Sequence, residues 1–406
     1  MYQIQFDKPV HVHFIGIGGI SMSGLAEILL SRKFPVSGSD SHESALTDQL
    51  AEQGAVIHYP QRTENITDDI DVVVYTAAIH PDNPEFRAAQ EKNLPMLTRA
   101  QLLGEIMRNY KEAINVSGTH GKTTTTSMIT EILLEAHKDP TVSVGGMLKD
   151  IGGNIRVGGQ ETFVVEACEY TNSFLSFFPT IEVILNVEAD HLDFFKDIDD
   201  IRHSFKLFAE KLPEDGLLVI NKDIKHSEYF TQALKCRVVT FGHEKDADYT
   251  ANFISYDKFA HPSYTLFYKG EELAKVELGV TGEHNIYNSL AAIAVARSLD
   301  IPMEVILRGL KRFTGTDRRF QKKGSVNGFT IIDDYAHHPQ EIAATIEAAK
   351  KYPHRKLWIA FQPHTYSRTA ALMDDFAGAL SQADEIVLAD IYAAREKNTI
   401  GISSDD

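Results

Sequence analysis

A lysine and a threonine at the end of a glycine-containing turn are the residues of this sequence best suited to bind phosphate. The stretch EAINVSGTHGKTTTTSM covers residues 112–128 and includes Gly121, Lys122 and Thr123. A phosphate-binding loop usually has a further glycine five residues before Gly121, but Val116 stands there. A strand-like run precedes the turn and a helix-compatible stretch follows it, so two interpretations remain: a shortened nucleotide loop, or a chance Gly-Lys-Thr at a helix start.

The chemistry of such a loop requires acidic partners. Lys122 would reach the β- and γ-phosphates of a triphosphate, and the Thr123 hydroxyl would bind Mg²⁺. Glu166 ends the apolar run TFVVE, and the run ILNVEADHLD leads into Asn186, Asp190, His191 and Asp193. Alone, such a glutamate or histidine is more often a surface or packing residue. Because parallel strands end at one edge of a sheet, we expect these groups to lie together there.

A second glycine cluster, HVHFIGIGGISMSG, stands between an N-terminal strand and helix. Backbone N–H groups at such a turn can bind a pyrophosphate, and Asp40, at the end of the next strand, can bind a ribose hydroxyl. The sixth position of the fingerprint is Ser21 instead of glycine. A tight turn for helix packing and a dinucleotide cofactor are both open interpretations of this cluster.

The elements that position these groups follow an alternating order. Strands are expected at Val10–Ile15, Val36–Ser39, Val56–Ile57, Asp71–Thr76, Ala113–Ser117, Thr162–Glu166, Ile181–Asn186, Gly216–Ile220, Phe329–Asp333, Lys356–Phe361 and Glu385–Leu388, with hairpins over Tyr249–Val280. Helices are expected at Met22–Ser31 and Ala45–Gln53 and after the turn at Lys122. This alternation indicates parallel sheets covered by helices. The 406 residues exceed one hydrophobic core, and we place domain boundaries near 110 and 313.

Bulk composition excludes several classes of protein. A formal charge of −17 argues against a nucleic-acid partner. Two cysteines, Cys168 and Cys236, are too few for a disulfide framework, and the N-terminus lacks a secretory signal pattern, so we expect a cytoplasmic protein. No apolar run approaches the roughly 18 residues of a membrane span. The oligomeric state is not predicted.

In this order along nearly the whole chain, the motifs GIGGISMSG, GTHGKTTT, the strand-end Glu166, NVEADHLD, GEHNIYNSLAA and DDYAHHPQE are similar to those of the Mur ligases. Within that family the chain most resembles the enzymes that add L-alanine to UDP-N-acetylmuramate. The resemblance implies an α/β fold of three domains: a Rossmann-like domain for the UDP substrate (residues 1–110), a central P-loop-type ATPase domain with a mostly parallel sheet (111–313) and a Rossmann-like domain for the amino acid (314–406). The short loop is then this family's own phosphate loop.

The implied reaction is an ATP-dependent ligation in peptidoglycan precursor synthesis. ATP phosphorylates the substrate carboxylate, the amine of L-alanine attacks the acyl phosphate, and phosphate leaves. The resemblance also implies two Mg²⁺ ions, with Mn²⁺ as an alternative.

The resemblance assigns site residues as follows. Lys122, Glu166, His191 and Asp334 are implied to be catalytic, with Thr123, Glu166 and His191 as metal ligands. ATP is implied to contact Gly118, Thr119, His120, Gly121, Lys122, Thr123, Thr124, Asn285, Asn288 and Arg319. The UDP substrate is implied to contact Gly18, Gly19, Ile20, Ser21, Asp40, Thr76 and Ala78. The amino acid is implied to contact Tyr335, His337, His338, His364 and Arg368, with Arg368 clamping its carboxylate.

The sequence departs from the family pattern in places. EACEY and HTYSR stand where many relatives have EADES and HRYTR, so Thr365 lacks a guanidinium and amino acid recognition depends more on Arg368 and the histidines. Lys206 is expected to be a surface lysine and not the carbamylated lysine of sister ligases. The family usually continues past DIYAARE, so we expect the C-terminal domain to be incomplete.

Three other readings remain. An oxidoreductase would use the N-terminal glycine loop for NAD but leaves Lys122 without a role. A sister ligase would add a peptide to UDP-N-acetylmuramate or glutamate to folate, although the folate enzymes lack the glycine-rich N-terminal domain. A non-catalytic nucleotide sensor would share the fold.

Overall fold

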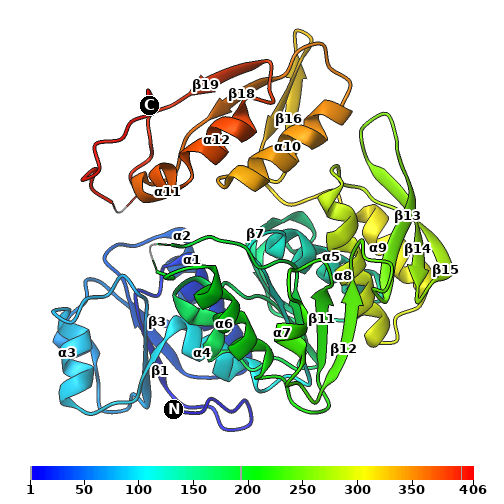
Figure 1. Ribbon diagram of the computed structural model, residues 1–406. Coiled ribbons are helices and arrows are strands. Elements are labelled where there is room, and N and C mark those ends of the chain that lie inside the picture. The colour runs from blue at the N-terminus through cyan, green and yellow to red at the C-terminus, as the bar shows by residue number, and fades with distance from the viewer. Residues whose placement is uncertain (1, 193, 395) are drawn as a thin grey trace.

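The computed structural model describes residues 2–192, 194–394 and 396–406. The chain forms three α/β units in sequence order, with the C-terminal unit lying over the other two (Figure 1). The N-terminal unit is a five-stranded parallel sheet of order β3-β2-β1-β4-β5. Its strands are β1 (Val12–Ile15), β2 (Val36–Ser39), β3 (Val56–His58), β4 (Val72–Tyr75) and β5 (Met96–Thr98). Its helices are α1 (Ile20–Ser31), α2 (Ala45–Glu52), α3 (Pro84–Glu91) and α4 (Arg99–Met107).

The central unit contains a ten-stranded sheet of order β15-β14-β13-β12-β11-β10-β6-β9-β7-β8. Its strands are β6 (Glu112–Ser117), β7 (Thr141–Leu148), β8 (Gly153–Arg156), β9 (Thr162–Glu166), β10 (Ile181–Ile184), β11 (Leu217–Asn221), β12 (Arg237–Phe241), β13 (Tyr249–Tyr256), β14 (Pro262–Tyr268) and β15 (Glu271–Glu277). Strands β10, β6 and β9 are neighbours in parallel register. The prediction that their carboxyl ends meet at one edge is therefore confirmed. The strand expected over Ile181–Asn186 ends at Ile184, which leaves Asn186 in the following loop.

The two faces of this sheet pack against different layers. Helices α5 (Lys122–Glu135), α8 (His284–Ser298) and α9 (Met303–Arg312) share one hydrophobic core with one face. On the other face lie α6 (Ile198–Ala209), α7 (Glu228–Thr231) and the 3-10 segment η3 (Tyr170–Ser176), in a core that continues without interruption into the N-terminal unit.

The N-terminal and central units are locked together by close backbone contacts. A Cβ on Gly24 of α1 would collide with Ile155 of β8, and one on Gly104 of α4 would collide with the backbone of Ser176. Arg32 adds hydrogen bonds from Nη2 to the carbonyl oxygens of Gly158 (2.7 Å) and Gly159 (2.9 Å). These contacts and the shared core pack the two units closely against each other.

The C-terminal unit has a small core of its own. Strands β16 (Gln321–Val326) and β17 (Phe329–Asp333) pair antiparallel, and β18 (Trp358–Phe361) and β19 (Glu385–Leu388) pair parallel. Helices α10 (Pro339–Lys351), α11 (Tyr366–Ala371) and α12 (Met373–Leu380) accompany them. In the parts of the chain that the structure describes, no helix combines the length and apolar character needed to cross a bilayer.

Candidate active site

The turn between β6 and α5 is held open by glycine and by Asn186. Gly118 and Gly121 have φ values of +139° and +84°, a region that disfavours residues with a Cβ. Asn186 brackets His120 with two hydrogen bonds: its Oδ1 accepts from the His120 backbone N–H (2.7 Å), and its Nδ2 donates to the His120 carbonyl (3.0 Å). The loop is thereby fixed against the end of β10, with the start of α5 directed at the site, where backbone N–H groups favour an anion.

Lys122 is held by acceptors from three residues. Its Nζ donates to the carbonyl oxygens of Gly118 (2.5 Å) and Thr119 (3.1 Å) and to Oε2 of Glu169 (3.0 Å). Burial acts to lower the pKa of Lys122, but the negative charges of the Glu169 and Glu166 carboxylates outweigh it and raise the pKa above its ordinary value. Lys122 is therefore a permanent cation in the loop. Sequence reasoning missed Glu169, although a second carboxylate three residues after Glu166 in EACEY was a visible signal.

The Glu169–Lys122 ion pair predicts a stability effect. Both side chains are largely buried, with 3% and 13% exposed. Glu169→Ala leaves a buried ammonium without its counter-charge and should destabilise the protein by about 3–5 kcal/mol. Urea unfolding measures the change. The double variant Glu169→Ala/Lys122→Met, which removes both charges, should recover most of the loss, and a double variant as unstable as the single one would contradict the prediction.

Thr123 and Glu166 are spaced like two neighbouring ligands of one Mg²⁺ ion. Oγ1 of Thr123 lies 2.9 Å from Oε2 of Glu166. Adjacent corners of an octahedron with bonds of 2.0–2.1 Å are about 2.9 Å apart. The backbone N–H of Gly145 also donates to this carboxylate (2.7 Å) and orients it. A hydroxyl, a carboxylate and phosphate oxygens form a donor set that suits Mg²⁺.

His191 lies near the Glu169 carboxylate that also binds Lys122. Its Nε2 is 3.9 Å from Oε1 of Glu169 and 3.8 Å from Oδ2 of Asp190. Burial lowers the pKa of His191, despite both carboxylates, which favours the neutral imidazole that binds metals. Within residues 2–192, 194–394 and 396–406, no three histidine, cysteine or carboxylate side chains form a metal site by themselves. Asp193 lies outside the described residues.

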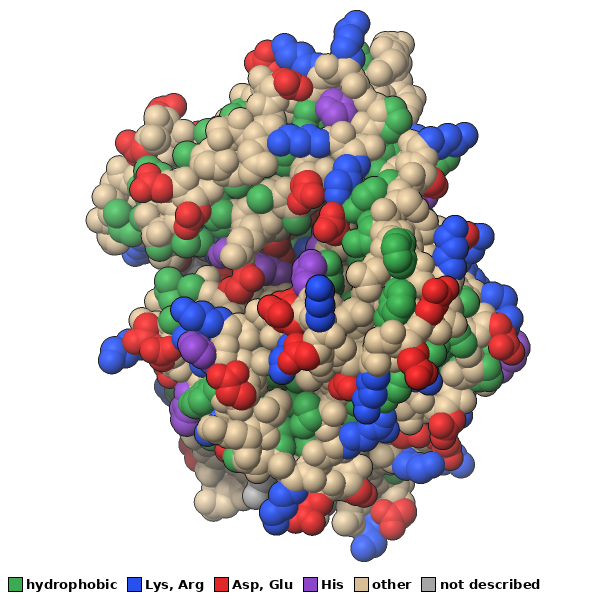
Figure 2. All heavy atoms as spheres, turned by 45° about the vertical axis from the view of Figure 1, so that its right-hand side comes forward, with side chains coloured by type: hydrophobic (Ala, Val, Ile, Leu, Met, Phe, Trp, Pro, Cys, Tyr) green, Lys and Arg blue, Asp and Glu red, His purple; other side chains and the backbone are tan. Residues whose placement is uncertain are grey.

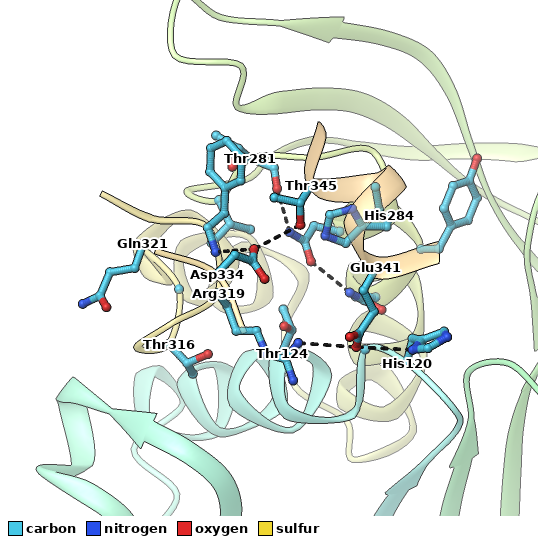
Figure 3. Close-up of a pocket in the computed structure, with 18 of the residues that line it drawn as sticks. His120, Thr124, Thr281, His284, Thr316, Arg319, Gln321, Asp334, Glu341 and Thr345 are labelled. Atoms are coloured by element: carbon cyan, nitrogen blue, oxygen red, sulfur yellow. Dashed lines mark hydrogen bonds and ion pairs between the residues drawn. The ribbon is translucent and has the colours of Figure 1, made fainter. Parts of the chain in front are cut away.

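A cavity of about 800 Å³ opens from the phosphate loop toward the C-terminal unit (Figure 3). Its wall includes His120, Gly121, Thr124, Asn285, Asn288 and Arg319 from the predicted ATP set, and Asp334 from the predicted catalytic set. Asn288 Nδ2 donates to Asn285 Oδ1 (2.9 Å), and Asn285 Nδ2 donates to the Thr281 carbonyl (2.7 Å). The two amides therefore lie on one face of α8, as expected, and orient each other.

Arg319 and Asp334 close this cavity from the C-terminal side. Arg319 Nη1 lies 3.6 Å from Oε1 of Glu341. Asp334 accepts hydrogen bonds from the backbone N–H groups of Phe320 and Ala336, both at 2.8 Å. Burial raises the pKa of Asp334, although these two N–H groups and Arg319 oppose it. The structure thus brings both residues to the cavity beside the phosphate loop.

His120 joins the phosphate loop to the C-terminal unit. Its Nε2 lies 3.3 Å from Glu188, and its Nδ1 lies 3.3 Å from Glu341 of α10. Burial acts to lower the pKa of His120, but the two carboxylates outweigh it and raise the pKa from 6.5 to about 9. Histidine side chains gather in the hollow between the upper and lower parts of the molecule (Figure 2).

This contact predicts a pH dependence. Because the pKa of His120 is higher in the folded protein, its stabilisation is fully present below pH 6.5 and is lost as the pH rises through about 9. The His120→Asn variant should melt at a lower temperature than the parent protein at about pH 6, and this difference in melting temperature should shrink by about pH 10. The corresponding loss in the free energy of unfolding has an upper limit near 3 kcal/mol. Thermal melts across this range measure it. A difference in melting temperature that grows with pH would contradict the prediction.

The predicted amino acid residues fall into two groups. His364 and Arg368 line a second cavity of about 290 Å³ together with Asp190 and His191. His337 is adjacent, with ring contacts to Tyr335 (5.2 Å between centroids) and His364 (6.4 Å). His338 lies apart from them: it caps the start of α10, and its ring is 4.9 Å from that of His120.

The predicted UDP residues gather at the carboxyl ends of β1, β2 and β4. The backbone N–H of Gly18 donates to Oδ2 of Asp40 (2.8 Å), and a Cβ on Gly16 would collide with Thr76. Gly19 caps α1, while Ile20, Ser21 and Ala78 are exposed at the same rim. These residues therefore lie near one another at one edge of the N-terminal sheet.

Comparisons with known proteins match this architecture. Family models described as "Mur ligase family, catalytic domain", "Mur ligase middle domain" and "Mur ligase, glutamate ligase domain" match residues 11–111, 116–296 and 318–402. The chain is 65% identical to a UDP-N-acetylmuramate–L-alanine ligase of Lachnospira eligens, over 100% of this chain and 89% of that protein.

Two solved structures are also similar. A UDP-N-acetylmuramate-alanine ligase of Thermotoga maritima is 32% identical with a TM-score of 0.76, over 94% of this chain and 85% of that one. A murein peptide ligase of Psychrobacter arcticus is 25% identical with a TM-score of 0.72, over 93% and 84%.

Proposed function

The chain belongs to the Mur ligase family, and on this basis we propose that it joins L-alanine to the carboxylate of UDP-N-acetylmuramate at the expense of ATP. The reaction releases ADP and phosphate and serves peptidoglycan precursor synthesis. One observation carries the proposal: a permanently charged Lys122, the Thr123–Glu166 pair and His191 surround one sheet edge beside a nucleotide-sized cavity. Identity of 65% with an alanine-adding ligase, against 25% with a peptide-adding one, favours L-alanine as the second substrate.

Each group has a distinct task in this reaction. Lys122 binds the γ-phosphate and offsets the charge that develops as the phosphoryl group moves to the substrate carboxylate. The loop N–H groups around Gly118–Thr124 orient the phosphates, and the Asn285 and Asn288 amides contact the base. Arg319 and Asp334 contact the nucleotide from the C-terminal unit. With the substrates aligned, positioning alone contributes roughly 7–11 kcal/mol.

Magnesium belongs to this proposal. Thr123 and Glu166 would hold one Mg²⁺ and His191 a second, and the ions would supply positive charge that draws phosphate and carboxylate oxygens together. Mn²⁺ suits the same donors. The burial of His191 and its lowered pKa support its role as a neutral ligand.

The remaining assignments extend the proposal to the other two substrates. The UDP moiety would bind Gly18, Gly19, Ile20, Ser21, Asp40, Thr76 and Ala78, and the amino acid would meet Tyr335, His337, His338, His364 and Arg368. The units would then correspond to residues 1–110, 111–313 and 314–406. The proposal places the reaction in the cytoplasm, as the cysteine content suggests.

The test is the amino acid profile of ADP formation. With UDP-N-acetylmuramate present, L-alanine should stimulate ADP and phosphate release, and omission of either substrate should abolish it. Glycine and L-serine serve as comparisons because one methyl group changes specificity by only about 1–3 kcal/mol. The absence of stimulation by any amino acid would refute a ligase. Stimulation by a peptide alone would indicate a peptide-adding enzyme.

A further inference from the structure

An ion pair spans the smaller cavity. Arg368 belongs to α11 of the C-terminal unit, and Asp190 follows β10 of the central unit. Arg368 Nη2 lies 3.3 Å from Asp190 Oδ1, and the side chains are only 15% and 9% exposed. Both residues line the cavity of about 290 Å³ that also contains His191 and His364. The pair therefore connects two units at the point where the phosphate edge meets the proposed amino acid site.

The pair is incompletely satisfied on both sides. Asp190 Oδ1 accepts from the His191 backbone N–H (2.7 Å) and from Arg368, whereas no group in the described part of the chain donates to Oδ2. A guanidinium has five N–H donors, and across residues 2–192, 194–394 and 396–406 Arg368 uses one of them. A buried ion pair that serves stability alone is expected to be bidentate and fully hydrogen-bonded. Within the described residues, Asp190 keeps an unused acceptor oxygen and Arg368 keeps unused N–H donors.

The other carboxylate of this cavity is already committed. Glu396 accepts from the backbone N–H of Ser367 (2.9 Å) and from the Ser367 hydroxyl (2.5 Å), so its charge serves the start of α11. Asp190 is therefore the carboxylate with an oxygen left for a ligand.

We propose that Arg368 and Asp190 together bind the two charges of the amino acid substrate, with Arg368 taking the α-carboxylate and Asp190 taking the α-ammonium. This inference rests on the proposed function and deepens it, because it assigns the amine an anchor on the central unit. A zwitterion beside the pair completes a ring of four alternating charges. It also positions the nitrogen next to His191, on the side of the cavity where the activated carboxylate must arrive. Ala371 and Leu372 provide the apolar wall for a small side chain.

The geometry has a consequence for closure of the enzyme. One end of the amino acid binds each unit, so the bound substrate bridges the C-terminal unit to the central one. A zwitterion is required for this bridge, and a molecule that carries only one of the two charges can engage only one unit.

Single-charge analogues test the assignment. Asp190→Asn keeps an acceptor for the His191 N–H but removes the charge, and it should raise KM for L-alanine by about 10- to 100-fold. Inhibition by propionate, which has no ammonium, should be kept or strengthened in Asp190→Asn, because Arg368 loses its counter-charge there, and weakened in Arg368→Met. L-Alaninamide, which has no carboxylate, should show the reverse pattern. Asp199→Asn, the same change at a carboxylate on α6 that is 81% exposed, is the matched control and should behave like the parent.

A second readout separates this inference from the function on which it rests. Acyl phosphate formed from ATP and UDP-N-acetylmuramate without amino acid can be trapped with hydroxylamine. If the parent protein forms none, the proposed function fails. A different outcome is that the parent protein forms acyl phosphate while Asp190→Asn loses acyl phosphate formation to the same extent as it loses alanine addition. In that case Asp190 serves the phosphate site and the inference is overturned. An unchanged KM for L-alanine in Asp190→Asn, or weakened propionate inhibition there, would overturn it as well.

Discussion

Replacement of Lys122 by methionine is expected to lower ATP-dependent phosphate release by at least about 10²- to 10³-fold. The side chain supplies a fixed positive charge at the mouth of the phosphate loop, and Glu169 and two loop carbonyls hold it in place before any substrate arrives. Methionine has a similar length but no charge, so the developing charge on the transferred phosphoryl group would lose its preorganised partner. Steady-state phosphate release with all three substrates present measures the effect.

The matched control for this change is Lys235→Met. Lys235 pairs with Glu214 at the surface, and both side chains are about three-quarters exposed, at 76% and 75%. The Lys235→Met variant should release phosphate at a rate within about twofold of the parent protein, because exposed ion pairs contribute little to stability. If the Lys122→Met protein is folded and retains more than about a tenth of the parent rate, the phosphate loop has no major role in the reaction.

Glu166→Gln is expected to cause the other large loss. The amide keeps an oxygen that can accept the Gly145 N–H, but it is a weaker Mg²⁺ ligand than a carboxylate. The rate at a fixed Mg²⁺ concentration should fall by about 10²-fold or more, and the Mg²⁺ concentration for half-maximal rate should rise. A titration of phosphate release with Mg²⁺ measures both.

Glu161→Gln is the control for Glu166→Gln. Glu161 is exposed immediately before β9, whereas Glu166 ends that strand at the site. The control should keep the parent Mg²⁺ dependence. Removal of the metal by chelation should abolish the activity of all variants, and a Glu166→Gln protein with the parent Mg²⁺ dependence would rule out Thr123–Glu166 as the metal pair.

The sheet edge was predictable because it follows from chain order. Apolar runs that end in functional groups mark parallel strands, and parallel strands end on one side. Lys122, Glu166 and His191 could therefore be placed together from the sequence. The strands not predicted are β5, which has only three residues, and β7, β8, β12 and β16. Short strands have too few positions for a periodic pattern to develop.

The side-chain partners were less accessible from the sequence. Glu169 lies in a 3-10 turn region after β9, where no periodicity indicates which way a carboxylate points. The Asp190–Arg368 pair joins residues 178 positions apart in different units, so only their relative placement reveals it. His338 shows the opposite limit. Its position beside His337 in the sequence gives no sign that its ring lies 4.9 Å from that of His120, at the start of α10.

The lock between the N-terminal and central units restricts how the enzyme can assemble its reactants. Gly24 against Ile155 and Gly104 against Ser176 leave no room for sliding, so the sugar nucleotide and ATP would dock on a single rigid frame. Movement of the C-terminal unit would then use the connecting segment 314–320, in which Gly315, Arg318 and Phe320 all have positive φ. Scattering curves recorded with saturating nucleotides should therefore fit the rotation of one body about one axis.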